Sequence, residues 1–428
     1  MSEVRKGYKL TELGEIPIEW NILTLGNVSK RITTKNKGLI SENVLTISAQ
    51  YGLVSQTEFF NKKVASSNLE GYYLLEKDDF AYNKSYSKGY PMGAIKPLTR
   101  YDNGVVSTLY ICFRLNSELN TMYFKNYFDS NLWHKEVAEI AQEGARNHGL
   151  LNVAVNEFFG IKIIVPTVEE QQKIALILST VDEQIDETEQ LIVKTQELKK
   201  GLMQQLLTKG IGHTEFKQTE LGEIPNEWKV VSFFNEIEEV YDYRGRTPKK
   251  IGLEWGNGNI RALSANNVKN GYIDFDAECY LASEELYRKW MTKGDLVKDD
   301  VLFTMEAPLG NVTLVPDNNK YILSQRVVAF RTSSNLNPHF FVQFLRSEKF
   351  KELLNTFATG TTAKGVSQKN LAKVQILLPN LKEQQKIASI LSTVDEQIKV
   401  YEREKAKYEE LKKGLMQQLL TGQIRVKI

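Results

Sequence analysis

The sequence predicts an α+β chain built as an internal repeat, in which two globular domains alternate with two long helices. Three observations lead to this fold class. The amphipathic segment "EQQKIALILSTVDEQI" at Glu170 recurs at Glu383 with one change, at an offset of 213 residues. The segment "LTELGEIPIEW" at Leu10 recurs as "QTELGEIPNEW" at Gln218, and "KKGLMQQLLT" at Lys199 recurs further along the chain. Self-similarity at a fixed offset is typical of tandem structural units.

The repeats divide the chain into two halves, each made of a linker, a variable block and a helix. We predict a first globular domain at residues 1–165 and a first spacer helix at 166–210. A linker with the second globular domain is expected at 211–378, and a second spacer helix at 379–428.

The two variable blocks resemble each other only faintly. Both contain a strand-like segment before a glycine turn, "ISAQYGLV" and "LSANNVKNGYI", and later an acidic pair before an apolar run, "DDFAYNK" and "DDVLFTM". We interpret them as divergent copies of one α+β fold. Because the helical segments stay nearly identical while the blocks diverge, the helices share one constraint and each block recognises something different.

The repeated segment is predicted to be helical by its apolar period. Steps of four and three residues form a coiled-coil seam in each copy. Pro166 and Pro379 stand just before the two helix starts, where proline is tolerated. The two apolar stripes are expected to cover each other, although packing of each helix on its own domain is an alternative. Polar seam residues are expected to weaken the pairing, to fix its register or to meet another subunit: Thr188, Thr195, Lys199, Lys405 and Lys412.

The composition bounds the class of protein. Hydrophobic residues make up 42% and charged residues 25% of the 428 residues, as in ordinary globular proteins. The N-terminus lacks an apolar signal region, and no run is apolar enough to span a membrane, so a cytoplasmic location is expected. The net charge of +2 is too small to indicate a nucleic-acid partner by itself. A phosphate-binding surface would have to be local.

The common catalytic patterns are missing from the sequence. The nearest match to an amino-methyltransferase tetrapeptide is "NPHF" at Asn337, which lacks a second proline and is predicted to be a helix N-cap. "GNGN" at Gly256 is interpreted as a turn, and no P-loop motif is present. The four histidines are scattered without companion thiols. We therefore expect no catalytic, cofactor or metal site in this chain.

With "GEIP.EW" before each block, and with each helix opening "EQQKIA.ILSTVDEQI" and closing "LKKGLMQQLLT", the chain resembles the specificity subunits of type I restriction-modification enzymes. The resemblance spans essentially the whole chain. It implies two target-recognition domains held apart by an antiparallel helix pair, each reading half of a bipartite, asymmetric double-stranded DNA target. It also implies two methyltransferase subunits that use S-adenosylmethionine, and motor-nuclease subunits that use ATP and Mg²⁺.

DNA reading requires cations for phosphates and polar side chains that reach base edges. Polar and basic clusters that interrupt strand-like runs are therefore the candidate DNA-binding residues. In the first block they are Lys35, Lys37, Tyr51, Asn83, Lys84, Ser85, Tyr86, Lys88, Arg146, Asn147 and His148. In the second block they are Arg244, Arg246, Lys249, Lys250, Asn266, Asn267, Glu306, Arg326, Thr361, Thr362 and Lys364. "GARNHG" and "GTTAKG" hold equivalent places in the two blocks. Arg326 is flanked by apolar residues, so a paired core arginine is its alternative role.

Two other functions are compatible with parts of the pattern. The chain would be a stand-alone methyltransferase or nuclease if it modified or cut DNA by itself. It would be a coiled-coil adaptor if both blocks bound proteins and no DNA target emerged from selection on random duplexes.

Overall fold

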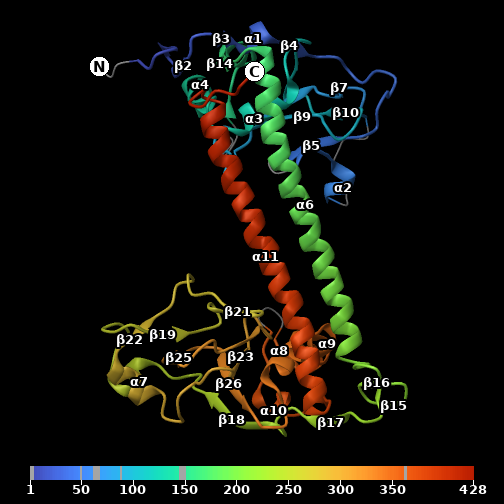
Figure 1. The fold of residues 1–428 in the computed structure, drawn as a ribbon, viewed down its shortest axis with the longest axis vertical. Helices are drawn as coiled ribbons and strands as arrows, with labels where there is room; N and C mark the ends of the chain where they lie inside the picture. The colour runs from blue at the N-terminus through green and yellow to red at the C-terminus, as the bar shows by residue number, and fades with distance from the viewer. Residues whose placement is uncertain (1–3, 49–50, 61–67, 87–88, 144–150, 361–363) are drawn as a thin grey trace. The chain divides into compact units, whose positions relative to one another are not determined.

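The computed structural model describes residues 4–48, 51–60, 68–86, 89–143, 151–360 and 364–428 (Figure 1). The chain forms two compact units. Unit 1 comprises residues 1–189 and 403–428, and unit 2 comprises residues 190–402. Each long helix contributes to both units, so each unit contains a segment from the other half of the sequence.

Unit 1 is built on an antiparallel sheet with the strand order β4-β11-β8-β9. Its strands are β1 (Tyr8–Thr11), β2 (Gly14–Pro17), β3 (Asn21–Thr24), β4 (Ser29–Ile32), β5 (Leu45–Ser48), β6 (Gly52–Ser55), β7 (Tyr73–Glu76), β8 (Phe80–Asn83), β9 (Ala94–Pro97), β10 (Asn103–Val106), β11 (Ile111–Leu115), β12 (Gln142–Glu143), β13 (Leu151–Asn152) and β14 (Lys162–Val165). Its helices are α1 (Leu25–Val28), α2 (Gln56–Phe60), α3 (Thr121–Asp129), α4 (His134–Ile140), α5 (Val155–Gly160) and the first part of α6 (Val168–Leu206).

Unit 2 has the same central sheet, in the order β18-β26-β23-β24. Its strands are β15 (Phe216–Thr219), β16 (Gly222–Pro225), β17 (Lys229–Ser232), β18 (Ile237–Asp242), β19 (Ile260–Leu263), β20 (Val268–Lys269), β21 (Tyr272–Ile273), β22 (Leu281–Ala282), β23 (Val301–Thr304), β24 (Val312–Leu314), β25 (Tyr321–Leu323), β26 (Val327–Thr332) and β27 (Gln375–Leu378). Its helices are η1 (Pro248–Ile251), α7 (Glu284–Trp290), α8 (Pro338–Arg346), α9 (Glu348–Phe357), α10 (Gln368–Leu371) and the first part of α11 (Leu381–Leu419).

A buried aspartate paired with a more exposed arginine marks the same place in both central sheets. Asp79, before β8, binds Arg114 of β11 through bonds of 2.6 and 2.9 Å. Asp300, before β23, binds Arg331 of β26 through bonds of 2.9 and 2.8 Å. Both carboxylates are almost fully buried, so the two-pronged guanidinium contact offsets the cost of their desolvation. The segments "DDFAYNK" and "DDVLFTM", which resemble each other in sequence, therefore occupy the same place in the two central sheets.

The helix that follows each sheet is also repeated. Asn120 caps α3 by accepting a hydrogen bond from the Tyr123 amide, and Asn337 caps α8 in the same way through the Phe340 amide. The predicted N-cap role of "NPHF" is confirmed. Both helices bury aromatic side chains at three matching positions in the cores of their units: Tyr123 and Phe340, Phe124 and Phe341, and Tyr127 and Phe344.

In each unit α6 and α11 run antiparallel and side by side (Figure 1). Both have 39 residues. Every predicted seam position is buried or half-buried, which confirms the period of the seam and the helix pairing: Ile174, Leu178, Val181, Ile185, Thr188, Ile192, Thr195, Lys199, Leu202 and Leu206 on α6, and Ile387, Leu391, Val394, Ile398, Tyr401, Lys405, Tyr408, Lys412, Leu415 and Leu419 on α11.

The seam lysines have acidic partners on the facing helix, which the sequence did not predict. Lys199 bonds to Asp395 at 2.5 Å and Lys412 pairs with Asp182 at 2.5 Å, so the two ties are equivalent under the internal repeat. Lys405 also pairs with a carboxylate of α6, that of Glu189. In the observed alignment of the helices, therefore, all three seam lysines have an acidic partner on the facing helix.

The "GEIP.EW" linkers form the hairpins β1–β2 and β15–β16 and anchor the helix starts. The buried Trp20 donates a 2.7 Å hydrogen bond to Glu170, and the buried Trp228 donates a 3.0 Å bond to Glu383. This contact explains why both the tryptophan and the glutamate recur in the two copies. No helix among the described residues is long and apolar enough to cross a membrane.

Candidate nucleic-acid interface

The two central sheets end in the same arrangement of backbone. Beyond β8, the carbonyl of Lys84 accepts a 3.0 Å hydrogen bond from the amide of Leu151. Beyond β23, the carbonyl of Met305 accepts a 2.9 Å bond from the amide of Val366. In both units, therefore, the segment that follows the predicted reading loop returns to the end of the same strand. The equivalence inferred for "GARNHG" and "GTTAKG" agrees with this flanking geometry.

In unit 2 this place holds two oppositely charged side chains. Nε of Arg326 lies 3.8 Å from Oε1 of Glu306, and the two side chains are 49% and 53% exposed. The alternative of a paired core arginine does not fit, since half of the Arg326 side chain faces solvent. Lys364 precedes Gly365, which forms a bridge with Glu306; its side chain is exposed and donates a 3.2 Å hydrogen bond to Asn355 of α9. These groups offer both donors and an acceptor to a polar ligand.

Arg244 lies next to this pair and is tied to its own strand. Its guanidinium bonds to the carboxylate of Asp242 at 2.7 Å, and Gln368 donates a 2.6 Å bond to the same carboxylate. The hydrogen bond to Asp242 and the charge of that carboxylate raise the pKa of Arg244, with a smaller contribution from Glu306. Burial by itself would raise the pKa of Asp242, but the bonds from Arg244 outweigh burial and hold that pKa below its usual value. Both groups therefore stay charged at neutral pH.

In unit 1 the corresponding strand end carries different side chains. Asn83 ends β8 and accepts a 3.1 Å hydrogen bond from the amide of Ser85, which fixes the turn. Lys84 is half-buried, Ser85 is exposed, and Tyr86 is 60% exposed. Unit 1 thus presents a lysine, a hydroxyl and a phenol where unit 2 presents an arginine and a carboxylate.

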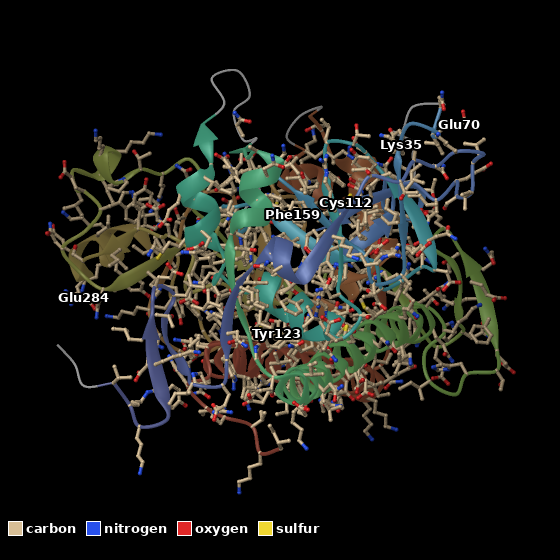
Figure 2. The ribbon with its side chains drawn as sticks, turned by 90° about the horizontal axis from the view of Figure 1, so that it is seen from above. Lys35, Glu70, Cys112, Tyr123, Phe159 and Glu284 are labelled. Carbon is tan, nitrogen blue, oxygen red and sulfur yellow. The ribbon has the colours of Figure 1, made fainter. Side chains whose placement is uncertain are left out.

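The other predicted residues of the first block lie apart from this strand end in the sequence and make their own contacts. Lys35 donates a 2.8 Å hydrogen bond to the carbonyl of Gly71 and sits 4.2 Å from the ring centre of Tyr73. Figure 2 labels Lys35 together with Glu70 at one edge of the side-chain view. Lys37 is exposed, and Tyr51 is 50% exposed. Lys37 and Tyr51 are accessible, whereas the Lys35 ammonium already contacts Gly71 and Tyr73 within unit 1.

Two predicted residues of the second block are engaged in contacts within the fold of unit 2. Asn267 is 1% exposed, and its side chain is bonded to Ser264, Asp274 and Ala277. Arg246 donates to the carbonyl of Trp290 at 2.5 Å and to Thr292 at 3.2 Å. Since Asn267 is buried and the guanidinium of Arg246 is engaged in hydrogen bonds within unit 2, we leave both out of the proposed interface.

Three further predicted residues of unit 2 remain at the surface. Lys249 and Asn266 are exposed, although Asn266 donates a 2.9 Å bond to the carbonyl of Glu278. Lys250 is exposed and bonds to the carbonyl of Gly245 at 2.8 Å. The remaining predicted residues lie outside the described part of the chain: Lys88, Arg146, Asn147, His148, Thr361 and Thr362.

Unit 1 also contains a groove that the sequence did not predict. It has a volume of about 1000 Å³, and its lining includes Tyr51, Lys96, Asp129, Asp182 and Lys412. Most of these charges are paired, as in the 2.5 Å contact of Lys96 with Asp129. The groove therefore has no strong preference for an anion or a cation. Among the described residues, no group of three or more His, Cys, Asp or Glu side chains is placed to hold a metal ion.

Two stretches of the chain match one protein-family model. The model is described as the type I restriction modification DNA specificity domain, and it matches residues 17–197 and 225–412. The two matches correspond to the two halves of the internal repeat.

Curated relatives are similar along most of their length. The chain is 28% identical to the type I restriction enzyme MjaVIII specificity subunit of Methanocaldococcus jannaschii, covering 96% of this chain and 94% of that protein. It is 27% identical to the putative MjaX specificity subunit of the same organism, covering 99% of this chain and 97% of that protein.

Solved structures share the fold at low sequence identity. The S subunit of a type I restriction-modification system from M. genitalium aligns with a TM-score of 0.56 at 14% identity, over 98% of each chain. A chain from a structure describing assembly and conformational transition of the type I R-M system aligns with a TM-score of 0.55 at 16% identity, over 96% of this chain and 99% of that one. These matches confirm the predicted fold class.

Proposed function

Since the chain belongs to the type I restriction-modification DNA specificity family, we propose that unit 1 and unit 2 each read one half of a bipartite, asymmetric DNA target. One observation carries this proposal. The two central sheets and their strand-end contacts are equivalent, whereas the exposed side chains at those strand ends differ. A common frame with different polar groups suits two readers of unlike base sequences.

Methylation and cleavage are assigned in this proposal to partner subunits. The methyltransferase partner would hold S-adenosylmethionine, and the motor-nuclease partner would hold ATP and Mg²⁺. The chain itself would supply recognition and a platform for assembly.

The test is a binding selection on random duplexes with the chain assembled with its methyltransferase partner. The expected result is one motif with two unlike half-sites separated by unread base pairs. Recovery of a single continuous motif, or of no motif, would overturn the proposal. A purified chain that methylates or cuts DNA without partners would contradict the assignment of chemistry to the partners.

The partner platform is proposed to be a surface that occurs twice, once in each unit. Residues 197–208 are identical to residues 410–421, although the helix positions just before them, 186–196 and 399–409, share only two identities. Within the identical stretch and the turn before it, one exposed helix face comprises Lys194, Leu198, Gly201 and Gln205, and its twin comprises Lys407, Leu411, Gly414 and Gln418. We call these two sets the repeat faces.

The repeat faces have properties that the fold does not require. Leu198 and Leu411 are 56% and 49% exposed. Gly201 and Gly414 lie inside helices, where glycine costs about 1 kcal/mol relative to alanine. Nothing lies within 4 Å of the Cβ that either glycine lacks. An exposed leucine beside a glycine that leaves the helix surface open suits close approach of another protein, and two such faces suit two copies of one partner.

Matched substitutions test this platform. Leu198→Glu and Leu411→Glu should each remove one methyltransferase subunit from the complex, and the double variant should remove both, as measured by light scattering during size-exclusion chromatography. The control is Leu191→Glu, because Leu191 is 42% exposed on the same helix and its repeat equivalent is already Glu404. Full assembly of the Leu198→Glu/Leu411→Glu variant would place the partners elsewhere.

A further inference from the structure

Arg326 is held in a backbone conformation that an arginine rarely adopts. Its φ angle is +69°, in the left-handed region that favours glycine. A non-glycine residue there costs roughly 1–2 kcal/mol, which converts to about 5- to 30-fold in the folding equilibrium. The position lies in the turn just before β26, and the carbonyl of Arg326 accepts a 2.8 Å hydrogen bond from the amide of Met305.

The contacts of Arg326 do not account for an arginine at this position. Its one ionic partner among the described residues is Glu306, at 3.8 Å, and about half of each side chain is exposed. Ion pairs of this length and exposure contribute little to stability. Glycine would satisfy the backbone at lower cost, so the contacts of the folded chain give no reason for an arginine at this position.

Backbone hydrogen bonds hold the main chain of both Arg326 and Glu306 in place. Met305 joins the turn of Arg326, and Glu306 forms a bridge with Gly365 in the segment that returns to the strand end. Arg326 and Glu306 are thus presented together from two anchored segments. Such anchoring limits the freedom that the side chains would lose on binding.

A positive and a negative side chain placed together fit the edge of a base pair better than they fit a phosphate. An arginine alone suits either, but a carboxylate beside it would be repelled by the DNA backbone. At a base edge both charges have partners, because guanine presents the acceptors O6 and N7 and cytosine presents its N4 amino donor in the major groove. The two side chains therefore complement the two bases of one G·C pair.

We propose that Arg326 and Glu306 together read a single G·C base pair, with Arg326 donating to guanine and Glu306 accepting from the cytosine amino group. This inference rests on the proposed function, and it names a specificity-determining pair in unit 2. Unit 1 carries Lys84, Ser85 and Tyr86 at the equivalent strand end, so the same reading is not expected there.

The test is binding selection with the chain assembled with its methyltransferase partner, using Arg326→Gly and Glu306→Gln. Arg326→Gly should lower discrimination at one G·C position of one half-site by about 5- to 150-fold, the range of a good two-pronged base contact. Glu306→Gln should relax the same position. Because glycine relieves the backbone strain, Arg326→Gly should unfold at the same temperature as the natural chain or at a higher one. Arg288→Ala, which removes an exposed arginine of α7, serves as the control.

Three outcomes separate this inference from the function on which it rests. A bipartite motif that keeps its preference at every position in Arg326→Gly would overturn the inference and leave the proposed function intact. A uniform loss of affinity with a shallower salt dependence would show a phosphate contact, and it too would overturn the base reading. Absence of any motif for the natural chain would overturn both.

Discussion

Asp395 of α11 joins α6 and α8 through one carboxylate in unit 2. It accepts bonds from Lys199 at 2.5 Å, from Arg346 at 2.9 Å and from Gln343 at 2.9 Å. The side chains of Lys199 and Arg346 are only 11% and 15% exposed. Asp395→Asn would therefore leave two largely buried cations without a counter-charge.

The expected cost follows from these exposures. Removing one member of a buried ion pair typically destabilises by about 3–5 kcal/mol. The Asp395 side chain is 22% exposed, and asparagine keeps one acceptor, so we expect a loss of about 2–3 kcal/mol in the free energy of unfolding of unit 2. Asp182→Asn is the matched variant of unit 1, where Asp182 meets Lys412 at 2.5 Å and Lys125 at 3.3 Å. It lacks the arginine and glutamine, so a smaller loss of about 1–2 kcal/mol is expected.

Urea unfolding followed by tryptophan fluorescence provides the assay. Trp20 and Trp133 report on unit 1, while Trp228, Trp255 and Trp290 report on unit 2. Replacing one set by phenylalanine separates the two signals. A loss below about 0.5 kcal/mol for Asp395→Asn, or equal losses in the two units, would refute the reasoning that the buried cations depend on this carboxylate.

Three further predictions concern pH, the reading surface and the helices. The pKa of Asp395 lies below its usual value of 3.8, because Arg346 and the bonds from Lys199 and Gln343 outweigh the effect of burial. Its contribution is therefore complete above that value and lost as the pH falls through the lowered pKa, so the stability difference between the natural chain and Asp395→Asn should shrink as the pH falls below 3.8 in urea titrations; a constant difference would contradict this. Lys364→Ala should weaken binding equally for all sequences with a shallower salt slope if it meets phosphate, or relax one position by about 1–3 kcal/mol if it meets a base; unchanged affinity at low salt would exclude both. Deleting residues 188–194 and 401–407 shortens each helix by roughly 10 Å and keeps the Asp182–Lys412 and Asp395–Lys199 pairs, so binding selection should favour a gap shorter by about three base pairs; an assembled variant that keeps the original gap would show that the helices do not set it.

The helices were the part of the fold that the sequence predicted best. A period of four and three residues is a local signal, and all seam positions from Ile174 to Leu206 are indeed covered. The acidic partners of the seam lysines were not predictable from that period. Lys199 looks like a break in an apolar stripe, and its partner Asp395 lies 196 residues away in the sequence. The structural role of a charged residue at a seam position can be inferred only when the residue that faces it on the other helix is known.

The sequence predicted the location of the candidate interface better than it predicted which residues belong to it. The equivalence of the two reading loops followed from their glycines and from the strands that enclose them. Asn267 seemed accessible because it lies in a polar turn, but its amide is saturated by carbonyls and by Ser264 in the same loop. The unusual backbone of Arg326 left no sequence signal, since glycine or asparagine is the residue that usually marks a positive φ.

The measurement that tests the account most directly is exchange of residues 232–378, the variable block of unit 2, for the corresponding block of a relative. The DNA target of the natural and exchanged chains, each assembled with methyltransferase subunits, would be determined by binding selection on random duplexes. Two independent readers on a common frame predict that one half-site changes while the other half-site and the gap remain. A change in both half-sites, or in neither, would contradict the account.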